Sequence, residues 1–142
     1  MTIAKIIGDR TSSSIISCDV STPVAEAVGM LAGKRIGALP VLRDGKIAGI
    51  ISERDVIYRL ADKGHAALDM TVGDIMTSPA VTVEPSTSID DALALMTKRR
   101  FRHFPVVDGE MLVAFISIGD LVKYKIGAVE YEAAALRDYI NQ

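Results

Sequence analysis

The chain contains an internal repeat, in which the second copy follows the first by 65 residues. The matches include turn, strand and helix-start residues: Ser21-Thr22 with Ser86-Thr87, Val24 with Ile89, Pro40-Val41 with Pro105-Val106, Ser52 with Ser117, and Asp55 with Asp120. A repeat of this length indicates one supersecondary unit per copy, each too small to bury its apolar face alone. The 142 residues are therefore expected to hold two similar units that pack face to face and share buried surface.

Each copy is predicted to run strand–helix–strand–strand–helix. The first strand is expected at residues 15–17 and at residues 80–83, and Thr22 or Thr87 then supplies the N-cap oxygen of a helix. Apolar residues at helical spacing in the second copy predict one buried stripe: Ile89, Ala92, Leu93 and Met96. The last helix of each unit is expected from about Glu53 and from about Ile118.

A β-hairpin is predicted in the middle of each copy. Asp44-Gly45 and Asp108-Gly109 each lie between two apolar runs, and this dipeptide is typical of hairpin turns. The two dipeptides are offset by 64 residues instead of 65. The strand after the second turn is therefore expected to be one residue longer than its counterpart.

The predicted fold class is α/β, of the α+β kind, with two β-α-β-β-α repeats related by pseudo-twofold symmetry. Each repeat is expected to have a three-stranded mixed sheet, because a right-handed crossover makes the first two strands parallel and the hairpin makes the third antiparallel. The predicted boundaries are 1–13 for an N-terminal segment, 14–63 for repeat 1, 64–79 for a linker with a short helix, 80–127 for repeat 2, and 128–142 for a C-terminal helix.

Composition indicates a packed protein without a strong charge bias. Hydrophobic residues make up 49% of the chain, and the net charge is −2. This balance argues against a nucleic-acid binder. Cys18 is the one cysteine, so an intrachain disulfide is excluded. Its side chain is expected to be packed. A reducing cytoplasm is the expected location of the protein. No stretch approaches the roughly 20 apolar residues of a membrane span, so no membrane association is expected.

The sequence also argues against an enzyme. It has no phosphate-binding P-loop, no dinucleotide fingerprint, and neither of the common zinc-protease and hydrolase motifs. The chain has only two histidines and one cysteine, and these are far apart. We therefore expect no catalytic residues, no metal site and no catalytic cofactor.

Four segments resemble the cystathionine-β-synthase (CBS) domain pair, also called a Bateman module. They are Gly49–Asp55, Phe101–Gly109, Ile116–Lys123 and Asp74–Thr77, and the resemblance covers roughly residues 14 to 126. It implies two clefts between the repeats, each able to hold an adenosine ligand such as AMP, ADP, ATP, NAD(H) or S-adenosylmethionine. It also implies a homodimer. Apolar residues of the second helices are the candidates for its interface: Val56, Ile57 and Leu60, with Leu121, Val122 and Ile126. An unidentified effector protein is expected to read the signal.

The motif Ser-x-x-Asp occurs at Ser52–Asp55 and at Ser117–Asp120. One interpretation is structural, because serine at the N-cap and an acid three residues later form a capping box. The other is functional: the resemblance places ribose contacts on these residues, and a carboxylate accepts hydrogen bonds from both ribose hydroxyls. A helix N-terminus beside it favours phosphate. Both interpretations can hold for one residue.

Basic residues near the repeat boundaries are the candidate phosphate contacts. The resemblance places Arg102 and His103 at the phosphate side of a cleft, while Arg35 holds a similar place in repeat 1 and Arg54 lies within the first motif. The alternative is a solvated helix end, favoured for Lys98 and Arg99. Gly49 would let an adenine lie against the backbone, whereas repeat 2 has Ala114 there, so the two clefts need not fill equally.

Apolar residues complete the predicted clefts. Pro40 and Pro105 are expected mainly to set strand geometry, and Ile16 and Val81 are expected in the core first and in the base pocket second. The full set of predicted ligand-binding residues is Ile16, Arg35, Gly37, Ala38, Pro40, Ser52, Arg54, Asp55, Val81, Arg102, His103, Phe104, Pro105, Ser117 and Asp120. The sequence thus favours a regulatory adenine-nucleotide sensor, and the alternative is a ligand-independent dimerisation or adaptor module.

Overall fold

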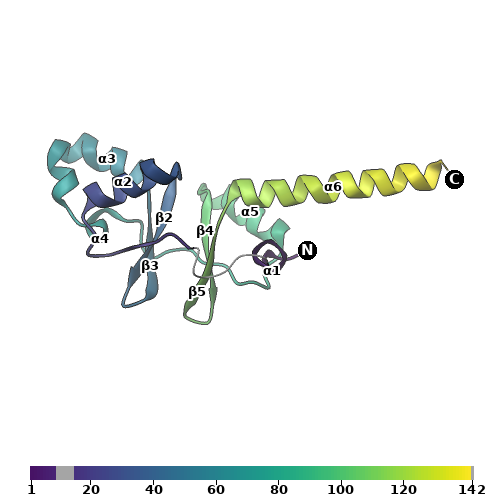
Figure 1. The fold of residues 1–142 in the computed structure, drawn as a ribbon, viewed down its shortest axis with the longest axis horizontal. Helices are drawn as coiled ribbons and strands as arrows, with labels where there is room; N and C mark the ends of the chain where they lie inside the picture. The colour runs from purple at the N-terminus through teal and green to yellow at the C-terminus, as the bar shows by residue number, and fades with distance from the viewer. Residues whose placement is uncertain (9–14, 142) are drawn as a thin grey trace.

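The two copies form two units whose hairpins meet at the centre of the molecule, with the helices on the outer sides (Figure 1). The computed structural model describes residues 1–8 and 15–141. Strands β3 and β5 lie next to each other across the boundary, and Lys46 pairs with Glu110 at 2.9 Å between the hairpin tips. The predicted mixed fold of two repeats is confirmed.

Unit 1 consists of β1 (Cys18–Asp19), α2 (Val24–Lys34), β2 (Ala38–Arg43), β3 (Lys46–Ser52) and α3 (Glu53–Lys63). Its sheet has the order β1-β2-β3, with the first pair parallel and the second antiparallel. This is the three-stranded mixed sheet predicted. The first strand, however, begins at Cys18 and not at residue 15, because Cys18 and Asp19 pair with Val41 and Leu42.

Unit 2 consists of α5 (Ile89–Arg99), β4 (His103–Asp108), β5 (Met111–Ser117) and α6 (Ile118–Ile140). Its sheet has two strands, so the prediction of a strand at 80–83 is wrong: only Val83 pairs, in a parallel bridge with Val106. In unit 1 the Val20 amide extends the ladder by donating to the Leu42 carbonyl. The matching residue in unit 2 is Pro85, which has no amide hydrogen, so the ladder ends.

Both hairpins are confirmed, but the predicted extra residue is not present. Strands β3 and β5 each have seven residues, and the turn positions are 44–45 in unit 1 and 109–110 in unit 2. Gly45 and Gly109 both have positive φ, at 79° and 64°. The paired strands of the two hairpins therefore keep the offset of 65 residues. The slip in the sequence only moves the glycine from the second turn position, at Gly45, to the first, at Gly109.

The threonines expected to cap helices close the preceding turns instead. The Thr22 hydroxyl accepts a hydrogen bond from the Asp19 amide at 3.0 Å, and Thr87 does the same for Glu84 at 3.1 Å. The residue at the N-cap of α2 is Pro23, while Ser88 caps α5 by accepting from the Asp91 amide at 3.0 Å. The threonine prediction was one position early, because a hydroxyl can serve a turn or a helix with the same local geometry.

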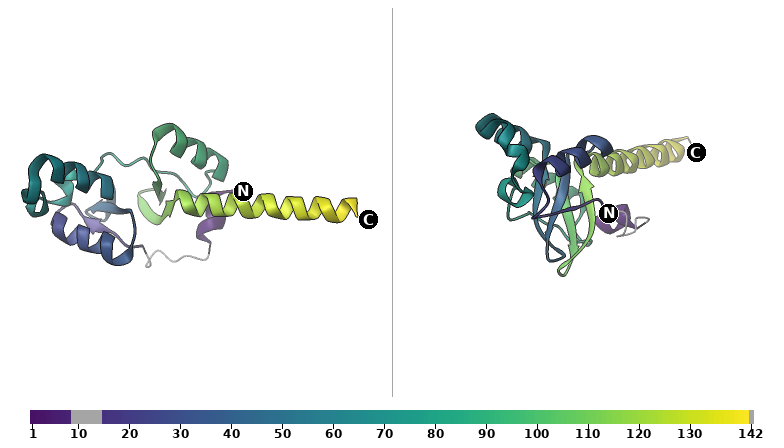
Figure 2. Two further views of the ribbon diagram at one scale, coloured as in Figure 1. Left: turned by 90° about the horizontal axis from the view of Figure 1, so that it is seen from above. Right: turned by 60° about the vertical axis from the view of Figure 1, so that its left-hand side comes forward.

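Helix α6 is continuous from unit 2 to the C-terminal part of the chain, which corrects the predicted break at Gly127. The helix projects beyond the body of the molecule (Figures 1 and 2). A glycine in a helix costs only about 1 kcal/mol relative to alanine. The strong helix formers that follow, from Ala128 to Arg137, outweigh this cost.

Two short helices pack where the sequence alone did not place them. The N-terminal helix α1 (Ile3–Ile7) inserts Ile3 and Ile6 into the core of unit 2, and α4 (Val72–Ile75), which follows η2 (Gly64–Asp69), contributes its two end residues to the core of unit 1. The Ile3 amide donates to the Thr87 carbonyl, and the Val72 amide donates to the Thr22 carbonyl. Each unit is thus closed by the segment that precedes the other unit in the chain.

The buried residues accordingly divide into two clusters, one per unit. This corrects the expectation that the units would need to share one buried surface. Phe104 lies at the centre of the unit 2 cluster with no exposed surface, and its ring packs edge-on against Phe101 at 4.8 Å between centroids. Partly buried side chains therefore line the boundary between the units, and the candidate site lies at this boundary.

Candidate functional site

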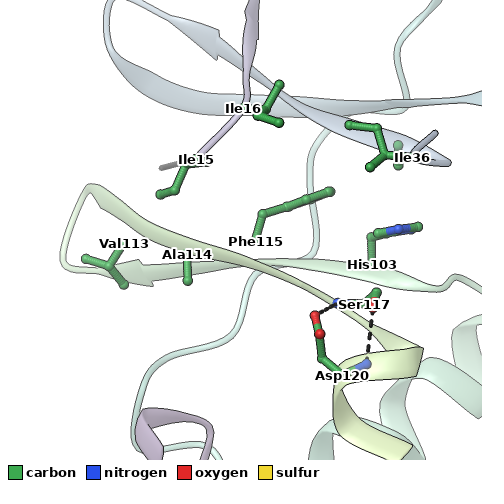
Figure 3. Close-up of a pocket in the computed structure, with 10 residues that line it drawn as sticks. Ile15, Ile16, Ile36, His103, Val113, Ala114, Phe115, Ser117 and Asp120 are labelled. Atoms are coloured by element: carbon green, nitrogen blue, oxygen red, sulfur yellow. Dashed lines mark hydrogen bonds between the residues drawn. The ribbon is translucent and has the colours of Figure 1, made fainter. Parts of the chain in front are cut away.

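A cavity of about 260 Å³ lies between the two units (Figure 3). Unit 2 contributes residues from β4, β5 and the start of α6, and the facing wall comes from the chain before β1 and after α2. The residues that line it are Ile15, Ile16, Ile36, Ala38, His103, Val113, Ala114, Phe115, Ser117 and Asp120. Five of the fifteen predicted ligand-binding residues therefore meet here: Ile16, Ala38, His103, Ser117 and Asp120.

The walls of the cavity are apolar and include an aromatic face. Ile16 and Ile36 lie opposite Phe115 and His103 (Figure 3). The His103 and Phe115 rings stack at 5.3 Å between centroids, with an angle of 11° between their planes. Ile16 is 37% exposed, which corrects the expectation that it is a core residue first. Flat apolar walls of this kind suit a planar ligand with a small number of polar contacts.

Ser117 and Asp120 form the polar corner of the cavity. The Ser117 amide donates to Asp120 Oδ2 at 2.9 Å, and the Asp120 amide donates to Ser117 Oγ at 3.2 Å, which is the predicted capping box of α6. The cap holds the carboxylate at the first turn of the helix, where the dipole favours negative charge. The structural interpretation of the motif is thus confirmed, and the same geometry presents the residue to the cavity.

His103 is the titratable side chain at the centre of the site. Burial lowers the pKa of its imidazole below the usual 6.5, the Arg102 charge lowers the pKa further, and the Asp120 and Glu53 carboxylates oppose both effects. Gly37 lies against it, since a β-carbon at Gly37 would be 3.6 Å from His103 Cε1. The folded state therefore holds this imidazole neutral near pH 7.

We expect the folded protein to lose the stability contributed by His103 on acidification. The unfolded chain takes up a proton near pH 6.5, but the folded imidazole with its lowered pKa resists protonation, so the unfolded state binds more protons below that pH. The unfolding free energy should therefore fall between about pH 7 and pH 5.5 more steeply for the wild type than for His103→Gln. Urea titrations across this range test the difference, with His65→Gln as the matched control. A difference that stays constant with pH would contradict it.

The first Ser-x-x-Asp motif lies at the pseudo-symmetric corner of the boundary, where the linker covers it. The Ser52 amide donates to Asp55 Oδ2 at 2.8 Å, and the Thr77 hydroxyl donates to Asp55 Oδ1 at 3.0 Å. Gly49 faces Met76 and Thr77 here, since a β-carbon would lie 2.6 Å from the Thr77 carbonyl oxygen. The structure therefore gives Gly49 a different role from the expected adenine contact: it admits the linker backbone.

The remaining predicted residues lie outside the cavity lining. Arg35 ends α2 in the left-handed conformation, at φ 53°, as Arg100 ends α5. Arg54 and Arg102 are exposed, Val81 packs partly buried against the unit 2 core, and Phe104 is fully buried. Pro40 and Pro105 are also buried, within β2 and β4.

Sequence reasoning did not select four residues of the cavity: Ile15, Ile36, Val113 and Phe115. Strand alternation holds the signal for two of them. In β5, Ala114 and Ile116 are buried in the unit 2 core, whereas the residues that alternate with them, Val113 and Phe115, are only partly buried. A strand with apolar side chains on both faces needs an apolar neighbour on each face. The face of β5 that carries Val113 and Phe115 must therefore meet another apolar surface. Here that surface is unit 1.

Within 1–8 and 15–141, no group of three or more histidine, cysteine, aspartate or glutamate side chains is placed to hold a metal ion. Among the helices of that part of the chain, none is long and apolar enough to cross a membrane. Cys18 is buried in unit 1, and burial raises the pKa of its thiol to about 11, with the Asp19 and Glu26 charges adding to the effect.

Comparison with known proteins agrees with the repeat. The family model for the CBS domain matches the chain twice, at residues 7–62 and 72–127. The chain belongs to the CBS-domain family. A solved structure of a protein with CBS domains from Burkholderia ambifaria is similar to this CBS pair, with 40% identity and a TM-score of 0.82, covering 89% of this chain and 95% of that one. The structural likeness thus extends over most of both chains.

Two other solved structures are complexes. CBSX2 in complex with AMP has 26% identity and a TM-score of 0.75, covering 89% of this CBS pair and 97% of that chain. The CBS domain pair of the protein MJ0100, in complex with 5′-methylthioadenosine and S-adenosyl-L-methionine, has 25% identity and a TM-score of 0.77, covering 90% and 98%. The ligands in these similar structures share an adenosine group.

Proposed function

We propose that this CBS pair is a regulatory module that binds an adenine nucleotide in the cleft between its repeats and signals to a partner protein. The observation that carries the proposal is the cavity, in which Asp120 and Ser117 form a polar corner beside the flat wall of His103 and Phe115. The adenosine ligands of the two similar complexes support the same class of ligand. AMP, ADP, ATP and NAD(H) all carry the adenosine group that the cleft would recognise.

The cleft suggests a role for each side of the ligand. The Asp120 carboxylate would accept the ribose hydroxyls, and the apolar walls, including Ile16 and Ala38, would enclose the base. His103 would lie on the phosphate side of the ligand, and a phosphate there would raise the pKa of the imidazole, against the effect of burial. Arg54 and Arg102 are exposed and carry no competing ion pair among the described residues, so they remain the proposed phosphate contacts.

The proposed module acts as a homodimer in a reducing cytoplasm. Large apolar side chains are exposed on both second helices, and these would form the interface: Ile57 and Leu60 on α3, Val122 and Ile126 on α6. Val56 and Leu121, which the sequence suggested for the same interface, instead face the cores of their own units. Ligand binding across the two units would shift a conformational equilibrium only by its differential affinity for the two states.

The alternative function is a dimerisation and adaptor module that needs no ligand. The confirmed capping boxes at Ser52 and Ser117 favour it, because they give both Ser-x-x-Asp motifs a structural role. In that case the exposed apolar faces of α3 and α6 would be the functional surface. The two functions differ in their response to nucleotides.

A thermal-shift panel on nucleotide-stripped protein tests the choice, with AMP, ADP, ATP, NAD⁺, NADH and S-adenosylmethionine. A ligand at about 100 times its Kd adds about 2.7 kcal/mol of stability, which raises the Tm by several degrees for a domain of this size. The matched control is 2′-deoxyadenosine monophosphate, which lacks one of the hydroxyls that Asp120 would accept. A response to AMP but not to its deoxy analogue supports the sensor. A flat panel on folded protein rejects it in favour of the adaptor.

A further inference from the structure

The second half of helix α6 is exposed on all sides. Every side chain from Val129 to Ile140 is exposed, and the helix projects beyond the body of the molecule (Figures 1 and 2). An isolated helix of this length is marginal in water, because most helices in proteins are stabilised by the packing of an apolar face. The apolar side chains of this segment, such as Leu136 at 60% and Ile140 at 70% exposed, therefore predict a surface that a partner covers.

An apolar stripe runs along α6 with the spacing of a coiled coil. Its members lie alternately four and three residues apart, and they are Val122, Ile126, Val129, Ala133, Leu136 and Ile140. At about 100° per residue, these positions fall within roughly 80° of the helix surface. Leu121 and Tyr124, which pack against the unit 2 core, lie on another face. A repeat of this kind is the a/d seam along which two α-helices pack knobs into holes.

The charged residues beside the stripe favour one orientation of two such helices. Lys125 and Glu132 lie on one flank, at position g of the heptad, and Glu130 and Arg137 lie on the other flank, at position e. In a parallel pair in register, each g residue faces the e residue of the next heptad in the partner. Lys125 would then face the partner's Glu130. Glu132 would face the partner's Arg137. Lys125 also pairs with Asp90 of α5 at 2.9 Å, but its ammonium group has several donors and can serve a second carboxylate.

An antiparallel pair that covers the same stripe brings like charges together. Glu130 of one chain would lie beside the partner's Glu130, and Glu132 beside the partner's Glu132. Lys123 would lie beside the partner's Arg137. Since like charges in these positions are destabilising, the charge pattern of α6 favours the parallel pair over the antiparallel one.

We propose that two copies of the chain pair through their α6 helices in a parallel, in-register coiled coil. The stripe is short for a free coiled coil, but Val122 and Ile126 already belong to the proposed dimer interface on the body, so the two surfaces are continuous. Both bodies then lie at the same end of the pair, and the two tails pack together from Val129 onwards. The inference rests on the homodimer of the proposed function and not on nucleotide binding.

Disulfide trapping of the full chain tests the pairing, comparing Leu136→Cys with Tyr131→Cys. In the parallel pair the two copies of position 136 meet in the seam, whereas the two copies of position 131 point away from it. Leu136→Cys should run mostly as a covalent dimer on a non-reducing gel after mild oxidation, and Tyr131→Cys should stay largely monomeric. The wild type is the unreactive control, because Cys18 is buried and burial raises the pKa of its thiol to about 11. Equal cross-linking at the two positions, or none at either, would overturn the coiled coil.

Charge reversal tests the orientation independently. Glu132→Lys and Arg137→Glu should each weaken the dimer about tenfold in sedimentation equilibrium, because an attractive pair that occurs twice in the dimer becomes repulsive. The double variant should return to the wild-type dissociation constant. Asp138→Lys makes the same change of charge as Glu132→Lys on the side of α6 away from the stripe, so it is the matched control and should leave the dimer unchanged.

The outcomes separate the coiled coil from the homodimer itself. A double variant that stays as weak as the single variants would overturn the parallel register. A dimer that forms without cross-linking at position 136 would overturn the coiled coil and leave the homodimer to the faces on the body. Monomers at every concentration would reject the proposed homodimer as well.

Discussion

Asp120→Asn should weaken AMP binding by about 100-fold while leaving the fold intact. The carboxylate of Asp120 would accept both ribose hydroxyls through charge-assisted bonds, whereas an asparagine keeps one acceptor oxygen and has no charge. The asparagine oxygen can still accept from the Ser117 amide, which is 2.9 Å from Asp120 Oδ2, so helix α6 remains capped. The change in unfolding free energy should stay below about 1 kcal/mol. Isothermal titration and urea unfolding measure the two effects separately.

Asp74→Asn is the matched control for this experiment. Asp74 forms the same capping box with Thr71 at the start of α4, where the Thr71 amide donates to Asp74 Oδ2 at 3.1 Å. Asp74 is exposed and is not among the residues that line the cavity. The control substitution should leave the AMP affinity unchanged. Equal affinities for wild type and Asp120→Asn would show that the second Ser-x-x-Asp motif only caps its helix.

Ile3→Ala should destabilise the protein by about 2–5 kcal/mol, a large part of the stability of a domain this size. Ile3 has no exposed surface and packs in the unit 2 core, in the same cluster as Phe104. Truncation to alanine removes three buried carbons and leaves a cavity that the surrounding helices and strands fill only partly. Urea unfolding with an unchanged m-value measures the loss.

Lys5→Ala is the control on the same helix, because Lys5 is exposed. It should change the unfolding free energy by no more than about 0.5 kcal/mol. A similarly small effect of Ile3→Ala would mean that the N-terminal helix does not close unit 2 in solution. The unit boundaries predicted from the sequence would then be adequate as they stand.

Local features of the fold were predictable from the sequence. Ser52 and Asp55 cap α3, and Ser117 and Asp120 cap α6, because a capping box needs only residues three apart in the chain. The hairpins follow from glycine at a turn position with positive φ. Even here, the choice of Thr22 as a helix cap was wrong, since its hydroxyl accepts from the turn at Asp19 instead.

The placement of α1 left a trace in the sequence that the offset of 65 conceals. Thr2-Ile3 and Ile6 match Thr71-Val72 and Ile75 at an offset of 69, so the spacing before the first strand differs by four residues between the copies. Both segments then make the same bonds, to the carbonyls of Thr87 and Thr22. The pattern shows that α1 and α4 are equivalent segments. It does not show that α1 packs on unit 2 and α4 on unit 1.

Patterns in the sequence predicted the repeated unit, its two hairpins and the starts of its second helices, because these depend on contacts between near neighbours in the chain. Long-range packing alone sets which segment closes each core, brings Phe115 and Ile36 face to face across a cavity, and joins Thr77 to Asp55. These contacts join residues far apart in sequence. Their geometry depends on how the two units pack, and no local propensity encodes that packing.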